Sequence, residues 1–82
     1  MAPTAYMIYT VDGKGNIGKA QEEALEDIRK IQGVEYAHST EGVYDGIIKI
    51  NAGTMDELKQ RTQSVRRLDT ISTTLTMIKI EG

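Results

Sequence analysis

The feature that most constrains the fold is a turn in the middle of the chain, between two segments with strand-forming composition. Gly42 gives the backbone the freedom that a tight reversal needs. The segment after it, Val43–Ile50, is rich in β-branched residues, and the segment before it, Val34–Thr40, is a shorter candidate strand. We therefore expect these two segments to pair as a β-hairpin at the centre of the fold.

One strand and one helix are expected on each side of this hairpin. Upstream, Ala5–Val11 has aromatic and β-branched residues without a breaker, which predicts a strand. Apolar residues at three- and four-residue spacing then predict a helix over residues 17–31. Downstream, Thr54-Met55-Asp56-Glu57 fits a capping box, in which the Thr54 and Glu57 side chains accept each other's free backbone N–H groups. A second helix is expected to begin there, and Ile71–Ile80 is the last predicted strand.

This order, β-α-β-β-α-β, is typical of the ferredoxin-like α+β fold. We predict a four-stranded antiparallel sheet with both helices on one face and with the first strand between the third and the fourth. One domain is expected over residues 5–80, after a disordered tail at residues 1–4. The first and last strands carry large apolar residues on both faces, so the face without helices would expose an apolar patch. We therefore expect a dimer joined through that face, an α/β sandwich.

The composition excludes several classes of function. The 82 residues include 10 basic and 12 acidic side chains, with a formal charge of −2, so nucleic-acid binding by bulk electrostatics is not expected. Cysteine is absent and His38 is the only histidine, so we expect neither a metal site nor another cofactor. No apolar run is long enough to span a membrane, which favours a soluble cytoplasmic protein. No nucleophile with an adjacent base is visible, so no catalytic residue is predicted.

Two groups of polar residues are candidate ligand contacts. Tyr44 and Asp45 follow the turn, and Thr74 and Thr76 project from one face of the last strand. A carboxylate and hydroxyls are groups that would hold the ammonium and carboxylate of an amino acid. The first strand separates the two groups in the predicted sheet, so they would share a pocket only through a loop or a neighbouring subunit. The same residues also suit a structural interpretation, in which the threonines favour a strand and Asp45 caps the turn.

The turn and the last strand together resemble a known family. Gly42-Val43-Tyr44-Asp45 is preceded by a helix that ends at Gly33-Val34 and is followed by Ile71-Ser72-Thr73-Thr74-Leu75-Thr76-Met77-Ile78. This arrangement is similar to the effector-binding domain of the Lrp/AsnC regulators, also called the regulation-of-amino-acid-metabolism (RAM) domain. The resemblance spans residues 5–80.

The resemblance implies dimers that associate into higher assemblies, with a site for an amino acid or a related small molecule in a crevice between dimers. Carried over by position, Tyr44 and Asp45 would line this site, and Asp45 would contact a ligand amine. Thr74 and Thr76 would offer hydroxyls to polar ligand atoms, and Gly42 would shape the turn.

Two departures from the family pattern affect the expected function. The chain begins almost directly at the first strand, whereas regulators of the family carry an N-terminal helix-turn-helix that binds DNA. A stand-alone domain is therefore expected, which would modulate transcription through a full-length partner regulator rather than bind DNA itself. Gly46 stands where the family usually has a larger apolar or aromatic residue, and this difference would widen the pocket.

Two other functions fit the same fold. A pure oligomerisation module would need no ligand. Cofactor-free monooxygenases of similar length are also ferredoxin-like dimers, but such an enzyme needs a polar group buried on the helix-covered face, for which Tyr36 and His38 are the candidates.

The segment Gly13-Lys14-Gly15-Asn16-Ile17-Gly18 matches the dinucleotide fingerprint G-x-G-x-x-G, but a small sheet with a central hairpin is not a Rossmann half. We interpret that segment as a loop between a strand and a helix.

Overall fold

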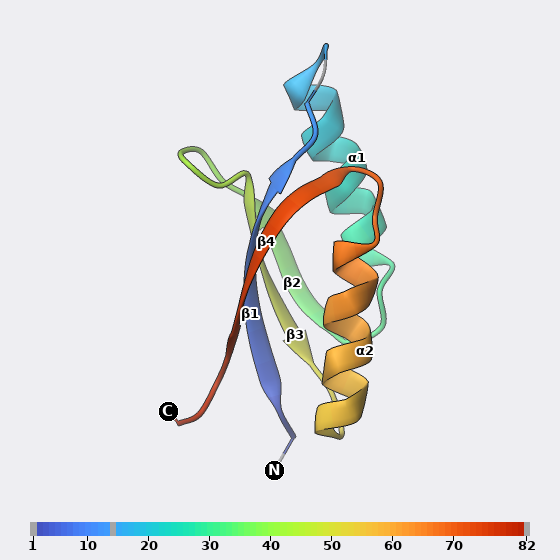
Figure 1. Cartoon of the computed structure of the whole chain (residues 1–82), viewed down its shortest axis with the longest axis vertical. Coiled ribbons are helices and arrows are strands. Elements are labelled where there is room, and N and C mark those ends of the chain that lie inside the picture. The colour runs from blue at the N-terminus through green and yellow to red at the C-terminus, as the bar shows by residue number, and fades with distance from the viewer. Residues whose placement is uncertain (1, 14, 82) are drawn as a thin grey trace.

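The computed structural model of the chain describes residues 2–13 and 15–81 and has the predicted element order (Figure 1). The elements are β1 (Thr4–Val11), α1 (Ile17–Arg29), β2 (Val34–Ser39), β3 (Gly46–Asn51), α2 (Met55–Arg66) and β4 (Ile71–Ile78). β1 thus begins one residue before its predicted start, and the Pro3 carbonyl accepts a hydrogen bond from the Ala52 N–H (3.1 Å).

The four strands form one antiparallel sheet in the order β2-β3-β1-β4, so β1 lies between β3 and β4 as predicted. Both helices cover the same face of the sheet, and the other face carries no helix (Figure 1). The fold is therefore the ferredoxin-like α+β fold expected from the sequence.

The core lies between the sheet and the two helices. Along β1 the side chains alternate between buried and half-buried, because successive residues of a strand point to opposite faces. The buried apolar side chains of this layer include Ala5, Met7, Tyr9 and Val11 of β1, Ile48 and Ile50 of β3, Ala24 and Ile28 of α1, and Leu58 and Val65 of α2. β1 contributes to the core along its whole length because it is paired on both edges.

The helix boundaries follow the capping residues. The Asn16 side chain accepts a hydrogen bond from the Lys19 N–H (3.1 Å) and begins α1. α1 ends at Arg29, two residues before the predicted end at Ile31.

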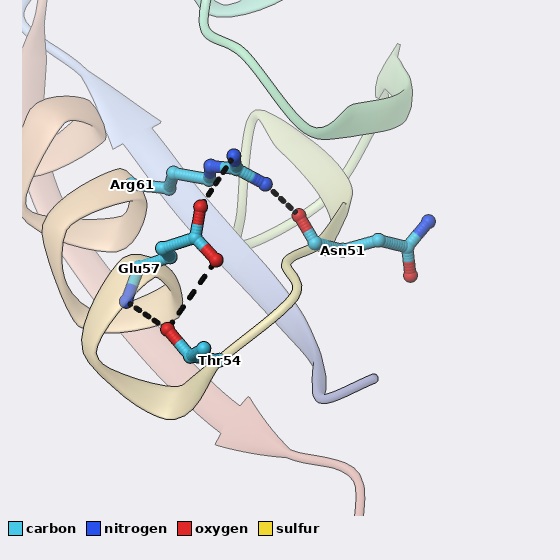
Figure 2. Close-up of polar contacts among 4 residues, drawn as sticks. All are labelled: Asn51, Thr54, Glu57 and Arg61. Carbon is cyan, nitrogen blue, oxygen red and sulfur yellow. Dashed lines mark hydrogen bonds and ion pairs between the residues drawn. The ribbon is translucent and has the colours of Figure 1, made fainter. Parts of the chain in front are cut away.

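α2 begins after Thr54, whose hydroxyl oxygen accepts the Glu57 N–H (3.1 Å), as the capping box predicts. The Glu57 carboxylate makes contacts other than the predicted one to the Thr54 N–H. It accepts the Thr54 hydroxyl (3.3 Å) and pairs with Arg61 (3.5 Å; Figure 2).

The connection between β2 and β3 is longer than the tight turn predicted from Gly42. β3 begins at Gly46, so Val43, Tyr44 and Asp45 belong to a loop over residues 40–45 and not to a strand. The Thr40 hydroxyl donates to the Tyr44 carbonyl (2.8 Å), and the Thr40 N–H donates to the Asp45 carbonyl (2.9 Å). These local bonds give the backbone partners outside the β2–β3 ladder. Gly42 has φ +134°, so the expected need for glycine at this position is confirmed.

The face of the sheet without helices is apolar at its centre. Its side chains include Tyr6 and Ile8 of β1, Ile47 of β3, and Leu75 and Met77 of β4. Leu75 and Met77 are each 53 % exposed, which is high for large apolar residues at the middle of a strand.

Among the described residues, no helix has the length and apolar character needed to cross a membrane.

Gly46 is the position where the fold tolerates a side chain least. A Cβ atom there would lie 2.2 Å from both Cζ and Oη of Tyr9. We predict that Gly46→Ala lowers the free energy of unfolding by about 1–3 kcal/mol, because the Tyr9 ring must leave its position in the core. Urea unfolding followed by circular dichroism measures this change.

Gly18→Ala is the matched control, because a Cβ at this α1 position would lie 3.6 Å from the nearest atom, Asn16 Oδ1. We expect this substitution to leave the stability unchanged or to raise it by about 0.5–1 kcal/mol. Equal stability of the two variants would contradict the proposed clash.

Candidate functional site

The candidate site surrounds Asp45, at the end of the sheet where β1 finishes. Asp45 Oδ2 accepts the Val11 N–H (2.8 Å) and Oδ1 accepts the Gln21 side-chain amide (3.1 Å). The carboxylate therefore joins the end of a strand to the first half of α1. This arrangement agrees with the structural interpretation of Asp45, but a carboxylate has about four acceptor positions and can still accept a ligand donor.

The loop that carries Asp45 is fixed at its end and open at its tip. The Asp45 N–H donates to the Tyr9 carbonyl (2.7 Å), which anchors the loop to β1. Val43 at the tip is 87 % exposed, whereas Tyr44 and Asp45 are half-buried. The loop thus carries the half-buried Tyr44 directly before the anchored Asp45 carboxylate.

Tyr9, whose carbonyl anchors this loop, is fully buried. The register places Gly46 on one side of it and Thr74 on the other. Its hydroxyl has no hydrogen-bond partner among the described residues, which is unusual for a buried polar atom. Burial, and secondarily the negative charge of Asp45, raise the pKa of the Tyr9 phenol, whereas Arg29 lowers it.

Gly46 does not widen a pocket in this chain, contrary to the sequence-based expectation. The space that a side chain at position 46 would occupy holds the Tyr9 phenol ring. A large aromatic residue paired with a glycine on a neighbouring strand is a known way to cover the glycine.

The two threonines lie on the helix-covered face of β4, opposite Tyr9 and Met7 in the β1–β4 ladder. The Thr76 hydroxyl accepts a hydrogen bond from Arg66 Nη2 of α2 (3.1 Å). Because β1 lies between β3 and β4, Thr74 and the start of β3 are two strand spacings apart, about 10 Å. The structure thus brings Gly42, Tyr44 and Asp45 together in one loop but does not bring them together with Thr74 and Thr76 within one chain.

Three residues of the site were not predicted. Arg66 lies on a helix face that the sequence pattern assigns to solvent, whereas Gln21 is a half-buried polar residue between Ile17 and Ala24 on the apolar side of α1. The pattern does not mark either residue as the partner of Thr76 or Asp45. Tyr9 could have been found, because the predicted pairing of the first and third strands allows an aromatic residue to lie against Gly46.

Tyr36 and His38, the candidates for an enzymatic role, point away from the helices. They flank the buried Ala37 on β2 and stack on each other, with ring centroids 5.0 Å apart. They therefore do not provide the polar group on the helix-covered face that the rival monooxygenase function requires.

The sequence was compared with profiles of known families. The profile described as the Lrp/AsnC ligand binding domain matches residues 7–81. The chain belongs to this family. A search of curated proteins found no significant match to this Lrp/AsnC domain.

Solved structures confirm the fold of this Lrp/AsnC domain. Escherichia coli AsnC superposes with a TM-score of 0.81 at 21 % identity, covering 98 % of this chain and 52 % of AsnC. The protein FFRP-DM1 superposes with a TM-score of 0.75 at 30 % identity, covering 98 % of this chain and 100 % of FFRP-DM1. A transcriptional regulator from Neisseria meningitidis, solved in complex with L-Met, gives a TM-score of 0.79 at 12 % identity, over 96 % of this chain and 50 % of that one. The chain therefore spans about half the length of AsnC and of the Neisseria regulator.

Tyr9→Phe tests the cost of the unpartnered hydroxyl. We predict that this substitution raises the free energy of unfolding by about 1 kcal/mol, because a buried polar atom without a partner is removed while the ring stays. In a domain of this size the melting temperature should rise by roughly 4–8 °C. A lower melting temperature would show that the hydroxyl makes a favourable interaction.

The same variant has a predicted pH dependence. The pKa of the Tyr9 phenol is higher in the folded state than the ordinary value of 10.0, because folding favours the neutral phenol over the phenolate. The stability that this preference contributes is fully present below pH 10 and is lost as pH rises through the folded-state pKa. Above pH 10 the unfolded phenol releases its proton before the folded one does. The stability of the wild type should therefore fall more steeply above pH 10 than that of Tyr9→Phe.

Proposed function

We propose that this Lrp/AsnC domain senses an amino acid or a related small molecule and modulates transcription through a partner regulator, without catalysis and without binding DNA itself. The observation that carries the proposal is the family match over residues 7–81, which includes the whole Gly42–Asp45 loop. The acidic balance of the chain, with a formal charge of −2, supports an indirect effect on DNA. We place this function in the cytoplasm.

In this proposal the ligand amine contacts Asp45 and the Tyr44 side chain covers the ligand. Asp45 is suited to this role because its two protein contacts hold the carboxylate in one orientation before a ligand arrives. The complex of the Neisseria regulator with L-Met is consistent with an amino-acid ligand. The threonines of β4 lie on the far side of β1, so in our proposal Thr74 and Thr76 contact a ligand held by a neighbouring subunit.

The proposed assembly begins with a dimer through the helix-free face of the sheet, and dimers then associate further. The half-exposed Leu75 and Met77 lie on this face beside Tyr6 and Ile8. Burying such a patch against a second copy would add to the limited core of a chain of 82 residues. An amino-acid site between dimers could then couple ligand binding to assembly.

A thermal-shift screen with the standard amino acids tests the sensing function. A ligand at about 100 times its dissociation constant stabilises the folded state by roughly 2.7 kcal/mol, which should raise the midpoint by several degrees. Asp45→Asn should abolish this shift, because the amide can still accept the Val11 N–H while the charge that holds the ligand amine is lost. Asp45→Ala is less informative, since it also removes the anchor of the loop.

The matched control is Glu22→Gln, which removes one negative charge from an exposed position of α1. It should keep the full ligand-induced shift. If no amino acid changes the midpoint of the wild type, amino-acid sensing is wrong and a pure assembly role is favoured.

Leu75→Glu tests the dimer. A carboxylate at the centre of the apolar face would have to be buried without a partner, so we predict that the variant is monomeric at micromolar concentration while the wild type is a dimer or larger. Met55→Glu places the same charge on an exposed apolar position of α2, away from that face, and should leave the assembly unchanged. Light scattering coupled to size exclusion measures both, and a monomeric wild type would contradict the proposal.

A further inference from the structure

The two outer strands of the sheet, β2 and β4, differ in how their free edges are protected. Each pairs with one neighbour, so the backbone N–H and carbonyl groups on its other edge have no strand partner within the sheet (Figure 1). Such an edge is a template for pairing with another chain, and proteins protect it with charges, irregularities or covering side chains. An outer strand without these protections is thus a candidate contact surface.

The free edge of β2 is protected in three ways. The β2–β3 ladder is irregular just after Val34, and the charged residue Glu35 lies at this irregularity. The Ala37 carbonyl belongs to the free edge, because the N–H of Thr40, three residues along, points towards Asp45 at the start of β3. This carbonyl accepts a hydrogen bond from Nη2 of Arg29, at the end of α1 (3.0 Å). A second strand therefore cannot pair along β2 without displacing the guanidinium.

The free edge of β4 carries the backbone groups of Thr74, Thr76 and Ile78. The N–H of Lys79 donates to the Thr4 carbonyl and so points towards β1 (2.9 Å). In an antiparallel ladder, residues that bond to the partner strand alternate with residues whose backbone groups point away from it. Because the β1–β4 register is regular over this part of β4, the alternation directs the N–H and carbonyl groups of these three residues outwards.

β4 lacks the protections that β2 has. Its eight residues, Ile71–Ile78, include no charged residue and no proline. Arg66 of α2 reaches this strand, but it donates to the side-chain hydroxyl of Thr76 and not to the backbone (3.1 Å). The large apolar residues of β4 are also open to solvent, and Ile78 is 42 % exposed. An uncharged, partly apolar edge of this length is suited to pair with a further strand.

The absence of charge favours a second copy of β4 as that strand. Antiparallel pairing of two identical strands places the same residues close together, which a strand with like charges would resist. If the two-fold axis lies at Leu75, Thr74 of each copy pairs with Thr76 of the other. This register places outward-pointing backbone groups opposite each other, and threonine pairs across neighbouring strands are favourable.

We propose that the free edge of β4 joins two copies of the chain, so that their sheets form one continuous antiparallel sheet. This contact uses backbone groups at the edge of the sheet, whereas the dimer proposed above uses side chains of the helix-free face. It therefore depends neither on that dimer nor on amino-acid sensing. Since the two contacts use different atoms, one copy can make both with different partners, and the edge then joins dimers into a larger assembly.

The test is hydrogen exchange of the ¹⁵N-labelled wild-type chain, followed by NMR without added ligand. The amides of Thr74, Thr76 and Ile78 should exchange about tenfold or more slowly than the amide of Val43, at the exposed tip of the loop. Exchange at these three amides as fast as at Val43 would leave the edge to a different chain and overturn the proposal. Slow exchange that persists in monomeric protein would also overturn it.

Thr74→Pro removes an outward N–H and places a ring on the free edge, where proline is tolerated because the N–H has no partner within the sheet. It should abolish the slow exchange at Thr76 and Ile78 and lower the mass measured by light scattering. Thr74→Val is the matched control, because it keeps both the N–H and a β-branched side chain, and it should behave like the wild type. The wild-type measurement decides the proposal if Thr74→Pro does not fold.

Ile8→Glu separates the edge contact from the dimer through the helix-free face. Ile8 lies on that face of β1, so the new charge opposes face packing and leaves the backbone of β4 unchanged. The slow exchange at Thr76 and Ile78 should remain in this variant. If Ile8→Glu abolishes the slow exchange and Thr74→Pro preserves it, the protection comes from the face contact and the edge proposal is wrong.

Discussion

The contact between the Tyr9 ring and Gly46 holds together the part of the molecule on which the candidate site is built. β1 is the strand with a neighbour on each edge, and Tyr9 is its largest fully buried side chain. The ring fills the space above Gly46, and the Tyr9 carbonyl accepts the N–H of Asp45. One residue thus fixes both the packing of the core and the start of the loop. The hydroxyl that it buries without a partner is a cost that this packing must offset.

Asp45 connects that packing to the proposed ligand site. Its carboxylate joins the end of β1 to α1 through Val11 and Gln21, so the loop, the strand and the helix form one rigid unit. A ligand that competes for this carboxylate would act on all three segments together. In the proposed function, this connection would link ligand binding to the arrangement of subunits, because α1 and the loop both border the sheet whose other face we propose as the dimer interface.

The fold could be predicted from the sequence to a large extent, and the details of the site could not. The aromatic and β-branched composition of β1, the Thr54 cap and the spacing of apolar residues in the helices are local signals, and they predicted the element order and the sheet topology. The end of β2 and the start of β3 depend instead on hydrogen bonds of Thr40 and Asp45, which compete with the strand ladder over residues 40–45. The partner of Thr76, Arg66, comes from a helix face that looks like ordinary surface, and the partner of Asp45, Gln21, is a polar residue within the apolar stripe of α1. Such tertiary pairs have no periodic signal in the sequence.

The central place of β1 also bears on how the chain folds. β1 is synthesised before the other elements of this domain, but its two neighbours come from residues 46–51 and 71–78. Pairing strands that are so distant in the chain closes long loops, which slows folding and makes it cooperative. Until β4 has emerged from the ribosome, β1 has one open edge and half of its ladder. β1 can therefore complete its pairing only after β4 has been synthesised, and the core can become complete only when nearly all of this domain is available.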